Sequence, residues 1–386
     1  MRYSLILLFS LASISLACQH KPDEVAAGAS RLSEYLPLLE GKRIALVANH
    51  TSLVGESHLL DVLMEDGNEV LRVFCPEHGF RGEAAAGARI EDNRDPISGV
   101  QVVSLYGSHR KPRPEDLKDV DIVVFDLQDV GARFFTYIST LHYVMEACAE
   151  NGVSVLVLDR PNPNGNYIDG PVLDPSFRSF VGMHPIPVVY GLTMGELAGM
   201  INGEGWLEDG VECDLKVIPC LNYSHQSSYS MPVRPSPNLG NDHSIRLYPS
   251  TCFFEGTVLS EGRGTAMPFE VFGHPDLDMD FRFTPVTIPG VSGNPKFKDV
   301  ECRGRDLRAF NPQDGFSRLY LGWLIEAWER FPDKDSFFTG YFDTLAGTSE
   351  LREQIEAGWD EARIRASWQE GLETYKRQRK PYLLYP

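Results

Sequence analysis

Three clusters of polar side chains in this chain of 386 residues contain the acids, amides and cations needed for acid–base chemistry. The first cluster reads Pro76-Glu77-His78-Gly79-Phe80-Arg81-Gly82 and follows an apolar run. Apolar neighbours such as Phe80 remove a carboxyl group from water, and such burial keeps Glu77 protonated near neutral pH, as a general acid requires. His78 is suited to share the proton transfer or to bind a metal, unless it only organises the loop. Arg81 is suited to bind a carboxylate, unless it pairs with a neighbouring glutamate.

The second cluster places two acids three residues apart at the start of a predicted helix. Asp126 and Asp129 flank Gln128, and Arg133 and Tyr137 follow. Either aspartate can instead cap the helix through its carboxylate. We therefore expect at most one of the two acids to act in catalysis, with the amide, the guanidinium and the phenol available to bind substrate.

The third cluster combines two acids with an arginine between glycines. Glu255 is followed by Glu261 and then by Arg263, which has glycine on both sides. Glycine neighbours let the backbone approach a ligand closely. A tight turn with solvated charges is the alternative interpretation of this cluster.

Two further apolar runs also end in polar residues. Asn49 and His50 follow the first run, and Asp159, Arg160 and Asn162 follow the fifth. Turn chemistry alone accounts for such residues at any one place. Their recurrence after four separate runs predicts one polar rim that binds a ligand.

The clusters follow short runs rich in β-branched residues, and these runs alternate with stretches of helical periodicity such as 58–64 and 134–149. Strand, helix and strand in this order predict an α/β fold in which a parallel sheet has helices on both faces. Ligands bind at the carboxyl ends of such strands, where the clusters lie. The predicted strands are 43–48, 70–74, 100–105, 122–125, 153–158 and 186–189.

A second, smaller domain is predicted beyond residue 250, because the regular alternation stops there. Strand-like pieces and many turn residues give way to two helical stretches, 316–330 and 364–379, which is typical of an α+β unit. Their recurring aromatic residues indicate packing in a core. We thus expect the α/β domain over 31–250 and the α+β domain over 251–386, with the second contributing to the cleft.

The N-terminus predicts export. Arg2 precedes an apolar run from Leu5 to Ala17, which is too short to span a bilayer and is typical of a signal peptide over 1–18. The residues before Cys18 loosely match the box at which bacterial lipoproteins are acylated, and 19–30 would then be a tether. We expect a protein that is periplasmic or anchored by a lipid on Cys18; an ordinary secretory signal is the alternative.

Composition excludes several functions. A net charge of −18 disfavours binding to nucleic acid or to anionic membrane surfaces. The cysteines form no CxxC pairs with nearby histidines, so we expect no metal site, although the compartment would allow a disulfide between Cys213 and Cys220. Neither a phosphate-binding glycine loop nor a G-x-S-x-G elbow is found, so we expect no cofactor and no serine nucleophile.

Seven strings span much of the chain: PEHGFRG, DLQDVGARFFTY, DRPNPNG, VYGLTMGEL, PSPNL, FFEGT and SEGRGT. Together they resemble the exo-β-N-acetylmuramidase family of bacterial cell-wall recyclers over about residues 41–275. The remaining C-terminal residues are similar to the family's C-terminal domain in general character. The resemblance implies a Rossmann-like first domain that binds no nucleotide, and release of N-acetylmuramic acid (MurNAc) from the non-reducing end of peptidoglycan fragments.

By this resemblance Glu77 is the catalytic acid/base, and its partner is one of Asp126, Asp129, Glu255 and Glu261, unless the substrate's own acetamido group assists. We expect Arg263 to bind the lactyl carboxylate that distinguishes MurNAc from glucosamine, with Arg81 and Arg133 as alternatives. Two other functions remain open at this stage. One is a non-catalytic muropeptide-binding or glycan-binding lipoprotein. The other is a metal-dependent amidase or esterase that uses His50, His78 and Asp126.

Overall fold

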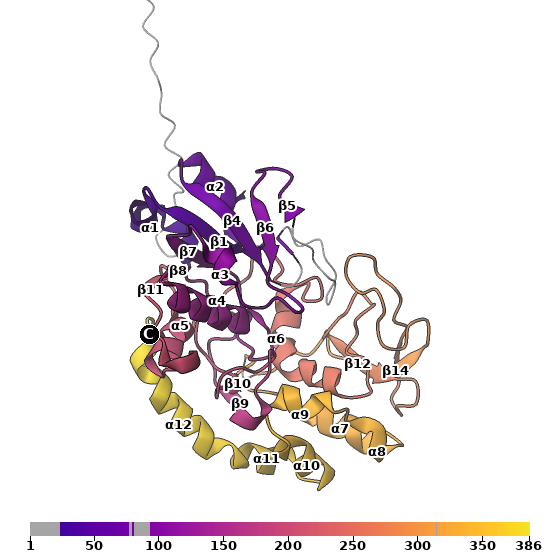
Figure 1. Cartoon of the computed structure of the whole chain (residues 1–386). Coiled ribbons are helices and arrows are strands. Elements are labelled where there is room, and N and C mark those ends of the chain that lie inside the picture. The colour runs from indigo at the N-terminus through magenta and orange to yellow at the C-terminus, as the bar shows by residue number, and fades with distance from the viewer. Residues whose placement is uncertain (1–23, 77–78, 81–92, 314) are drawn as a thin grey trace, which may run out of the picture.

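A sheet of seven strands forms the centre of the first unit (Figure 1). The computed structural model describes residues 24–76, 79–80, 93–313 and 315–386. Six of the strands run parallel, and the short edge strand β5 runs antiparallel to β6. From edge to edge the order is β11 (Leu215–Ile218), β8 (Ser154–Leu158), β7 (Ile122–Asp126), β1 (Arg43–Ala48), β4 (Glu69–Cys75), β6 (Gln101–Ser104) and β5 (Asn93–Arg94).

The order of the strands reverses between β1 and β7. After β1 the chain adds β4 and β6 on one side, whereas β7, β8 and β11 are added on the other side. Ala48, the last residue of β1, lies opposite Asp126, the last residue of β7, so the carboxyl ends of these two strands are aligned. Ligands of open α/β sheets bind at such a reversal. We call the region just beyond Ala48 and Asp126 the switch point.

Helices cover both faces of this sheet. Alternate side chains of β1 enter two apolar clusters: Ile44 and Leu46 pack with α1 and α2, whereas Ala45 and Val47 pack with α4 and α5. Burial on both faces explains why the strands are apolar throughout. The predicted α/β class with a Rossmann-like parallel sheet is confirmed. The helices are α1 (Leu32–Leu39), α2 (Leu59–Glu65), α3 (Pro114–Leu117), α4 (Tyr137–Asn151) and α5 (Met194–Gly203).

The second unit is smaller and has the predicted α+β character. Its three strands form an antiparallel sheet in the order β12-β14-β13, which lies beside the helices α7 to α9 (Figure 1). The helix α6 (Asp242–Thr251) and the 3₁₀ helix η4 (Cys252–Gly256) lead into it from the first unit. Its elements are β12 (Val271–His274), β13 (Phe281–Phe283), β14 (Cys302–Asp306), α7 (Gly322–Arg330), α8 (Lys334–Phe337), α9 (Tyr341–Ala346) and α10 (Glu350–Glu356).

The end of the chain returns to the first unit. The helices α11 (Glu361–Ser367) and α12 (Gln369–Arg379) run back along the molecule, and the C-terminus lies beside α5 and β11 (Figure 1). α12 packs on β9 (Asp169–Val172), which forms an antiparallel pair with β10 (Pro187–Val189). Another small pair joins β2 (Leu53–Val54) to β3 (Ser57–His58) next to α2.

The two ends of the described chain meet at the carboxyl end of β8 and β11. Near the start, Ala26 pairs with Leu221, and the Gly28 N–H donates to the Asp159 carbonyl at 2.7 Å. A side chain at Gly28 would place its Cβ 2.2 Å from the Ile218 carbonyl, so this contact requires glycine. At the other end, the Tyr385 hydroxyl accepts a hydrogen bond from the backbone N–H of Cys220 at 2.8 Å.

Three details differ from the sequence predictions. The run 186–189 forms β10 outside the parallel sheet, because Pro185 and Pro187 lack the N–H groups that a central strand needs. The predicted helix 364–379 is divided at Trp368 into α11 and α12. Cys213 and Cys220 are buried free thiols and not a disulfide. No helix within the described ranges has the length and apolar character needed to cross a bilayer.

The predicted helix 316–330 forms only over its second half. Before Gly322 the backbone N–H of Leu319 donates to Asp169 Oδ2 at 2.8 Å, and that of Tyr320 donates to Ser250 Oγ at 2.9 Å. These bonds to distant side chains take the place of hydrogen bonds within a helix. The segment therefore serves as a bridge to the first unit.

Candidate active site at the switch point

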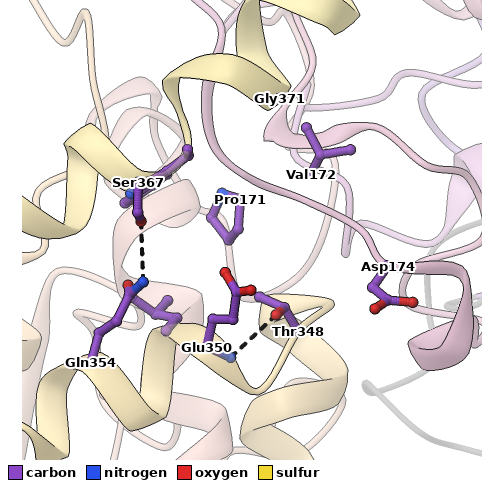
Figure 2. A pocket seen from close by; sticks show the side chains of 10 residues that line it. Pro171, Val172, Asp174, Thr348, Glu350, Gln354, Ser367 and Gly371 are labelled. Carbon is purple, nitrogen blue, oxygen red and sulfur yellow. Dashed lines mark hydrogen bonds between the residues drawn. The ribbon is translucent and has the colours of Figure 1, made fainter.

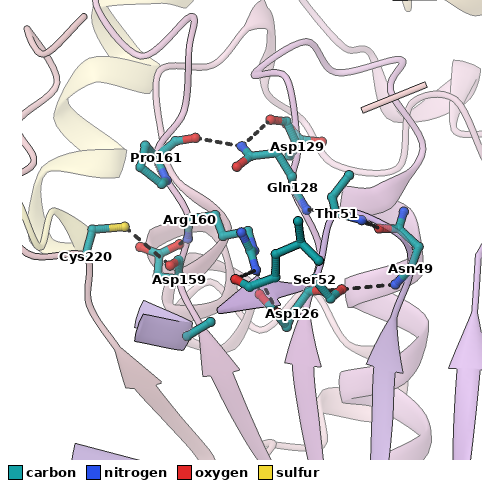
Figure 3. A network of polar contacts seen from close by, with 12 residues as sticks. Asn49, Thr51, Ser52, Asp126, Gln128, Asp129, Asp159, Arg160, Pro161 and Cys220 are labelled. Atoms are coloured by element: carbon teal, nitrogen blue, oxygen red, sulfur yellow. Dashed lines mark hydrogen bonds and ion pairs between the residues drawn. The ribbon is translucent and has the colours of Figure 1, made fainter. Parts of the chain in front are cut away.

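The loop after β1 is fixed by its own side chains. Asn49 Oδ1 accepts hydrogen bonds from the backbone N–H and the hydroxyl of Thr51 at 2.9 and 2.6 Å, and Asn49 Nδ2 donates to the Tyr137 hydroxyl at 2.8 Å. The Ser52 hydroxyl donates to the carbonyl of Asp126 and joins this loop to the end of β7 (Figure 3). Asn49 and Tyr137, both predicted to bind substrate, are buried and bind each other.

A buried ion pair between Asp126 and Arg160 joins the ends of β7 and β8. Arg160 Nε lies 2.5 Å from Asp126 Oδ1, and Arg160 Nη2 lies 2.8 Å from Asp126 Oδ2. Arg160 Nη2 also donates to the Leu53 carbonyl at 3.1 Å, so one guanidinium holds three loops together (Figure 3). Two parallel bonds of this kind fix the carboxylate plane as well as its charge. Asp126 is therefore occupied by Arg160.

Gln128 bridges the loops after β7 and β8. Its Nε2 donates to the carbonyls of Asp129 and Pro161 at 2.9 and 2.8 Å (Figure 3). Its Oε1 is buried and has no hydrogen-bond partner within the described part of the chain. The amide thus offers an acceptor at the switch point while its donors keep it in place.

Asp129 is a buried carboxyl group whose charged form is disfavoured. Its Oδ2 accepts hydrogen bonds from the Tyr190 hydroxyl at 2.5 Å and from the Gly131 N–H at 2.6 Å. Burial raises the pKa of Asp129 to about 7, and the two hydrogen bonds oppose that rise. Gly131 has a φ of +75°, and a Cβ there would lie 2.1 Å from Asn162 Oδ1. Asp129 therefore holds a tight turn and carries a proton that exchanges near neutrality.

Asp159 and Asn162 order the loop after β8. Asp159 Oδ1 accepts from the N–H groups of Arg160 (3.0 Å) and Gly195 (2.8 Å), the second of which lies in the first turn of α5. Burial raises the pKa of Asp159 to about 6 in spite of these bonds. Asn162 is also buried and donates to the Leu192 carbonyl at 2.8 Å. Both side chains, predicted to bind substrate, are engaged within the protein.

Arg133 does not lie at the rim, contrary to the sequence prediction. Its guanidinium is fully buried and donates to four backbone carbonyls, at 2.6 to 3.1 Å. Burial lowers the pKa of Arg133 to about 9. Because the guanidinium is fully buried and its four Nη hydrogens are bound by backbone carbonyls, Arg133 joins the two units and is not placed to bind a substrate carboxylate. The carbonyls belong to Pro171, Ile186, Leu345 and Ala346.

The third predicted cluster forms a line of alternating charges in the second unit. Arg263 Nη2 lies 2.6 Å from Glu255 Oε1, and Arg263 Nε lies 3.1 Å from Glu261 Oε1. Glu261 Oε2 faces Lys296 Nζ at 3.7 Å. The acids raise the pKa of Arg263 against the opposing effect of burial. Arg263 is thus already paired with two carboxylates, whereas the Glu255 side chain is 23% exposed.

Aromatic side chains connect this cluster to the switch point. Tyr137, which binds Asn49, meets the edge of Phe135 at 4.8 Å between ring centroids, and Phe135 meets Tyr248 at 6.0 Å. Tyr248 then meets Phe269 at 4.9 Å. The Arg263 guanidinium lies over the other end of this series, 5.0 Å from the Phe269 ring. The structure therefore brings the second and third clusters together across the two units.

Some predicted site residues cannot be placed in this network. Glu77, His78 and Arg81 lie outside the described residues. His50 lies at the switch point, and its Nε2 is 2.9 Å from the Arg234 carbonyl. Among the described residues, no group of three or more histidines, cysteines or acids is arranged to hold a metal ion.

A separate small cavity lies between β9 and the helices α10 to α12 (Figure 2). In its lining, Gln354 Nε2 donates to the Ser367 hydroxyl at 3.1 Å, and Asp174 lies at one side. None of the residues predicted to act in catalysis lines this cavity. It is therefore distinct from the switch point.

Comparison with known proteins decides the family. The profile described as exo-β-N-acetylmuramidase NamZ, N-terminal, matches residues 44–243, and the corresponding C-terminal profile matches residues 246–385. The chain belongs to the exo-β-N-acetylmuramidase NamZ family. It is 40% identical over 378 residues to the peptidoglycan β-N-acetylmuramidase NamZ of Bacillus subtilis, covering 92% of this chain and 89% of the relative.

Two solved structures of DUF1343 family proteins from Bacteroides fragilis share the fold. One is 46% identical with a TM-score of 0.87, covering 94% of this chain and 99% of the other. The second is 30% identical with a TM-score of 0.81, covering 94% and 100%. NamZ family membership thus extends through the C-terminal part of the chain, where the sequence strings indicated only general similarity.

The site of this NamZ family member includes residues that the sequence did not single out. Tyr190, Thr193 and Gly195 bind Asp129 or Asp159, and all three lie in the string VYGLTMGEL. That string carried the family resemblance but contains no acid or cation at these positions. Tyr385 also binds Asp159, from the far end of the chain. No local signal marked it, because its partners are distant in sequence.

Proposed function

We propose that the protein is an exo-acting glycoside hydrolase that releases MurNAc from the non-reducing end of peptidoglycan-derived fragments. The observation that carries this proposal is the NamZ family match over both units, 44–243 and 246–385. It is supported by the geometry of the switch point, where buried polar side chains and an aromatic series join the two units. MurNAc-containing saccharides are the proposed substrates.

Glu77 is the proposed general acid. Its string PEHGFRG follows β4, the strand next to β1 in the sheet. A proton delivered to the glycosidic oxygen lets the sugar on the reducing side of MurNAc leave, and a second group stabilises or attacks the anomeric carbon of MurNAc.

Glu255 is the proposed second carboxylate. Asp126 is taken by Arg160, Asp129 is buried under Tyr190, and Glu261 is only 5% exposed. Glu255 is the most exposed of the four candidate acids and binds Arg263 through one oxygen. The bond from Arg263 Nη2 fixes the orientation of the Glu255 carboxylate, as a nucleophile or a water-activating base requires.

The first test uses a β-linked MurNAc chromogenic glycoside, with its N-acetylglucosaminyl counterpart as the control. We expect hydrolysis of the MurNAc glycoside, and a loss of at least about a hundredfold in kcat for Glu77→Gln with substrate binding retained, since general acid catalysis contributes about 10² to 10⁴. The native rate should fall on the alkaline side as Glu77 loses its proton. A non-catalytic glycan-binding protein would bind both and cleave neither, and Glu77→Gln would then change nothing.

The second test replaces Glu255 by Gln, which keeps the size of the side chain but removes its charge. We expect kcat to fall by about a hundredfold or more, because the group that assists at the anomeric carbon is lost. Glu301→Gln is the matched control, since Glu301 also pairs with an arginine of the second unit but at an exposed position. Equal activity of the two variants would remove Glu255 from the mechanism and favour assistance by the substrate's acetamido group.

We also propose that the protein is exported and anchored by a lipid on Cys18. The support is the signal-like run from Leu5 to Ala17 and the small residues before Cys18. Mass spectrometry of the mature protein should find an N-terminal diacylated cysteine. An unmodified N-terminus at another residue would replace this proposal with an ordinary secretory signal.

A further inference from the structure

The C-terminal tail reaches the carboxyl end of the parallel sheet. The Tyr385 hydroxyl lies 2.6 Å from Asp159 Oδ2 and 2.8 Å from the backbone nitrogen of Cys220. A backbone N–H can only donate, so the hydroxyl accepts from Cys220 and must donate its own proton to Asp159. The tail is held there by two more bonds, from the Leu384 N–H to Glu196 and from the His225 N–H to the Pro386 carbonyl.

Asp159 connects Tyr385 to the switch point, because its carboxylate binds both Tyr385 and Arg160. The Thr193 hydroxyl donates to the same Oδ2 at 2.6 Å, whereas Oδ1 accepts from the backbone N–H of Arg160 at 3.0 Å. The guanidinium of Arg160 binds both oxygens of Asp126 at 2.5 and 2.8 Å. The hydrogen bonds of Tyr385 and the end of β7 are therefore linked through Asp159 and through the backbone and side chain of one residue, Arg160.

We propose that Tyr385 is a positioning residue of the active site, which holds Arg160 against Asp126 through the Asp159 carboxylate. This inference rests on the proposed function, because it treats the switch point as the place where substrate binds. Tyr385 touches no reacting atom in this scheme. Its hydroxyl keeps Asp159 ionised, and the ionised form is the better acceptor for the Arg160 N–H.

The surroundings of Asp159 make its ionisation sensitive to one donor. The carboxyl is buried, and its pKa of about 6 is a balance between burial, which raises it, and hydrogen bonds from Thr193, Tyr385 and Gly195, which lower it. Loss of one charge-assisted bond shifts such a group by about one pH unit or more. The titratable and charged groups that face Asp159 are Arg160, Tyr190, Glu196, Cys220, Tyr223 and Tyr385.

Tyr385→Phe tests the proposal, and Tyr382→Phe is the matched control. Tyr382 lies three residues earlier on the same tail and also donates to a carboxylate, Glu204, at 2.7 Å, but Glu204 is not part of the link from Tyr385 to Arg160. With protein labelled with ¹⁵N-arginine, the backbone amide signal of Arg160, which reports the bond to Asp159, is identified by its loss in Arg160→Lys. We expect the pH midpoint of this signal to rise by about one unit in Tyr385→Phe and to stay unchanged in Tyr382→Phe.

The activity readout is the pH profile of kcat/KM on the MurNAc glycoside. We expect the acid limb of Tyr385→Phe to move upward by the same interval, with a loss of about fivefold at pH 6 and full activity recovered at higher pH. A merely structural residue would lower activity at all pH values alike. Equal midpoints for native protein and Tyr385→Phe would overturn the proposal.

Two further outcomes are informative. If the native protein does not cleave the glycoside while the Arg160 midpoint still moves in Tyr385→Phe, the proposed function fails and the positioning role stands. If Tyr385→Phe does not fold, the native protein still decides: the Tyr385 ring signals and the backbone amide signal of Arg160 should share one pH midpoint near 6. Separate midpoints would show that Asp159 does not couple the two residues.

Discussion

At the scale of single residues, the ionisable groups of the first unit are stabilised mainly by partners that are fixed in the fold. Arg133 is the clearest case, because its side chain is fully buried and donates to four carbonyls from three segments. A buried guanidinium is tolerated only where such acceptors replace water. These carbonyls lose their guanidinium donors if Arg133 is replaced.

Arg133→Met should therefore destabilise the protein strongly. Methionine fills much of the volume but removes a donor from four carbonyls, of which Ile186 keeps the Leu173 N–H and the other three lose their guanidinium partner. Each buried group left without a partner costs about 1–3 kcal/mol. We expect the free energy of unfolding in urea to fall by at least about 3 kcal/mol. Arg282→Met is the control, because Arg282 is 57% exposed and pairs only with Glu301 at the surface, where such pairs contribute about 0–1 kcal/mol. Similar losses in the two variants would contradict this account.

The sequence indicated which residue types form the site but not their exposure. Arg133 and Arg160 both follow polar strand ends, and both were predicted to meet substrate. Their acceptors come from residues as far away as Ala346 and from a paired aspartate on another strand. Burial of this kind depends on which segments pack together, and spacing within one string carries no information about it.

At the scale of elements, the parallel strands were predictable and the irregular segments were not. The runs 43–48 and 122–125 match β1 and β7 to within one residue, because strands buried on both faces are apolar throughout. The edge strand β11 (Leu215–Ile218) was missed, since it is short and carries the exposed Lys216. The helix α7 begins only at Gly322, because the backbone N–H groups of Leu319 and Tyr320 donate to side chains that are distant in sequence. No local sequence pattern predicts these bonds.

His142 of the helix α4 and His184, which precedes β10, form a buried pair. His142 Nδ1 lies 3.1 Å from His184 Nε2, so the two rings share one hydrogen. His184 also stacks on Trp206 at 5.1 Å between centroids. Burial and the neighbouring His142 lower the pKa of His184 well below its usual value. His184 therefore stays neutral in the folded protein at a pH where it is protonated in the unfolded chain.

This difference predicts a loss of stability in mild acid. Because the folded pKa is depressed, the contribution of His184 is complete above the unfolded value of about 6.5 and declines as pH falls below it, by at most about 1.4 kcal/mol per pH unit. Asp129, whose folded pKa is raised to about 7, acts in the opposite direction. The measurement is therefore the difference in unfolding free energy between native protein and His184→Gln from pH 7.5 to 5.

That difference should shift steadily in favour of His184→Gln as the pH falls, because glutamine has no proton to gain. The effect of Asp129 is common to both proteins and cancels. Parallel curves for the two proteins would mean that His184 is protonated in the folded state or has an ordinary pKa there.

At the scale of the whole molecule, the two units are joined by more than the link through α6. Arg133 binds the end of α9, Arg365 of α11 lies 2.6 Å from Asp169 of β9, and α12 packs on β9. A cleft built from both units needs such connections, because its two sides must keep their spacing to fractions of an ångström. The contribution of the second unit to the cleft stays a prediction.

The two ends of the described chain lie close together. Ala26 pairs with Leu221 while Tyr385 binds Cys220, so these ends are anchored on adjacent residues. Chains whose termini lie close together tolerate circular permutation. A short linker from Pro386 to Glu24, with new termini opened in the exposed turn at Gly358, should yield a protein that unfolds cooperatively like the native chain. In such a permutant α11 and α12 would leave the ribosome before the first unit, whereas the rest of the second unit would still follow it.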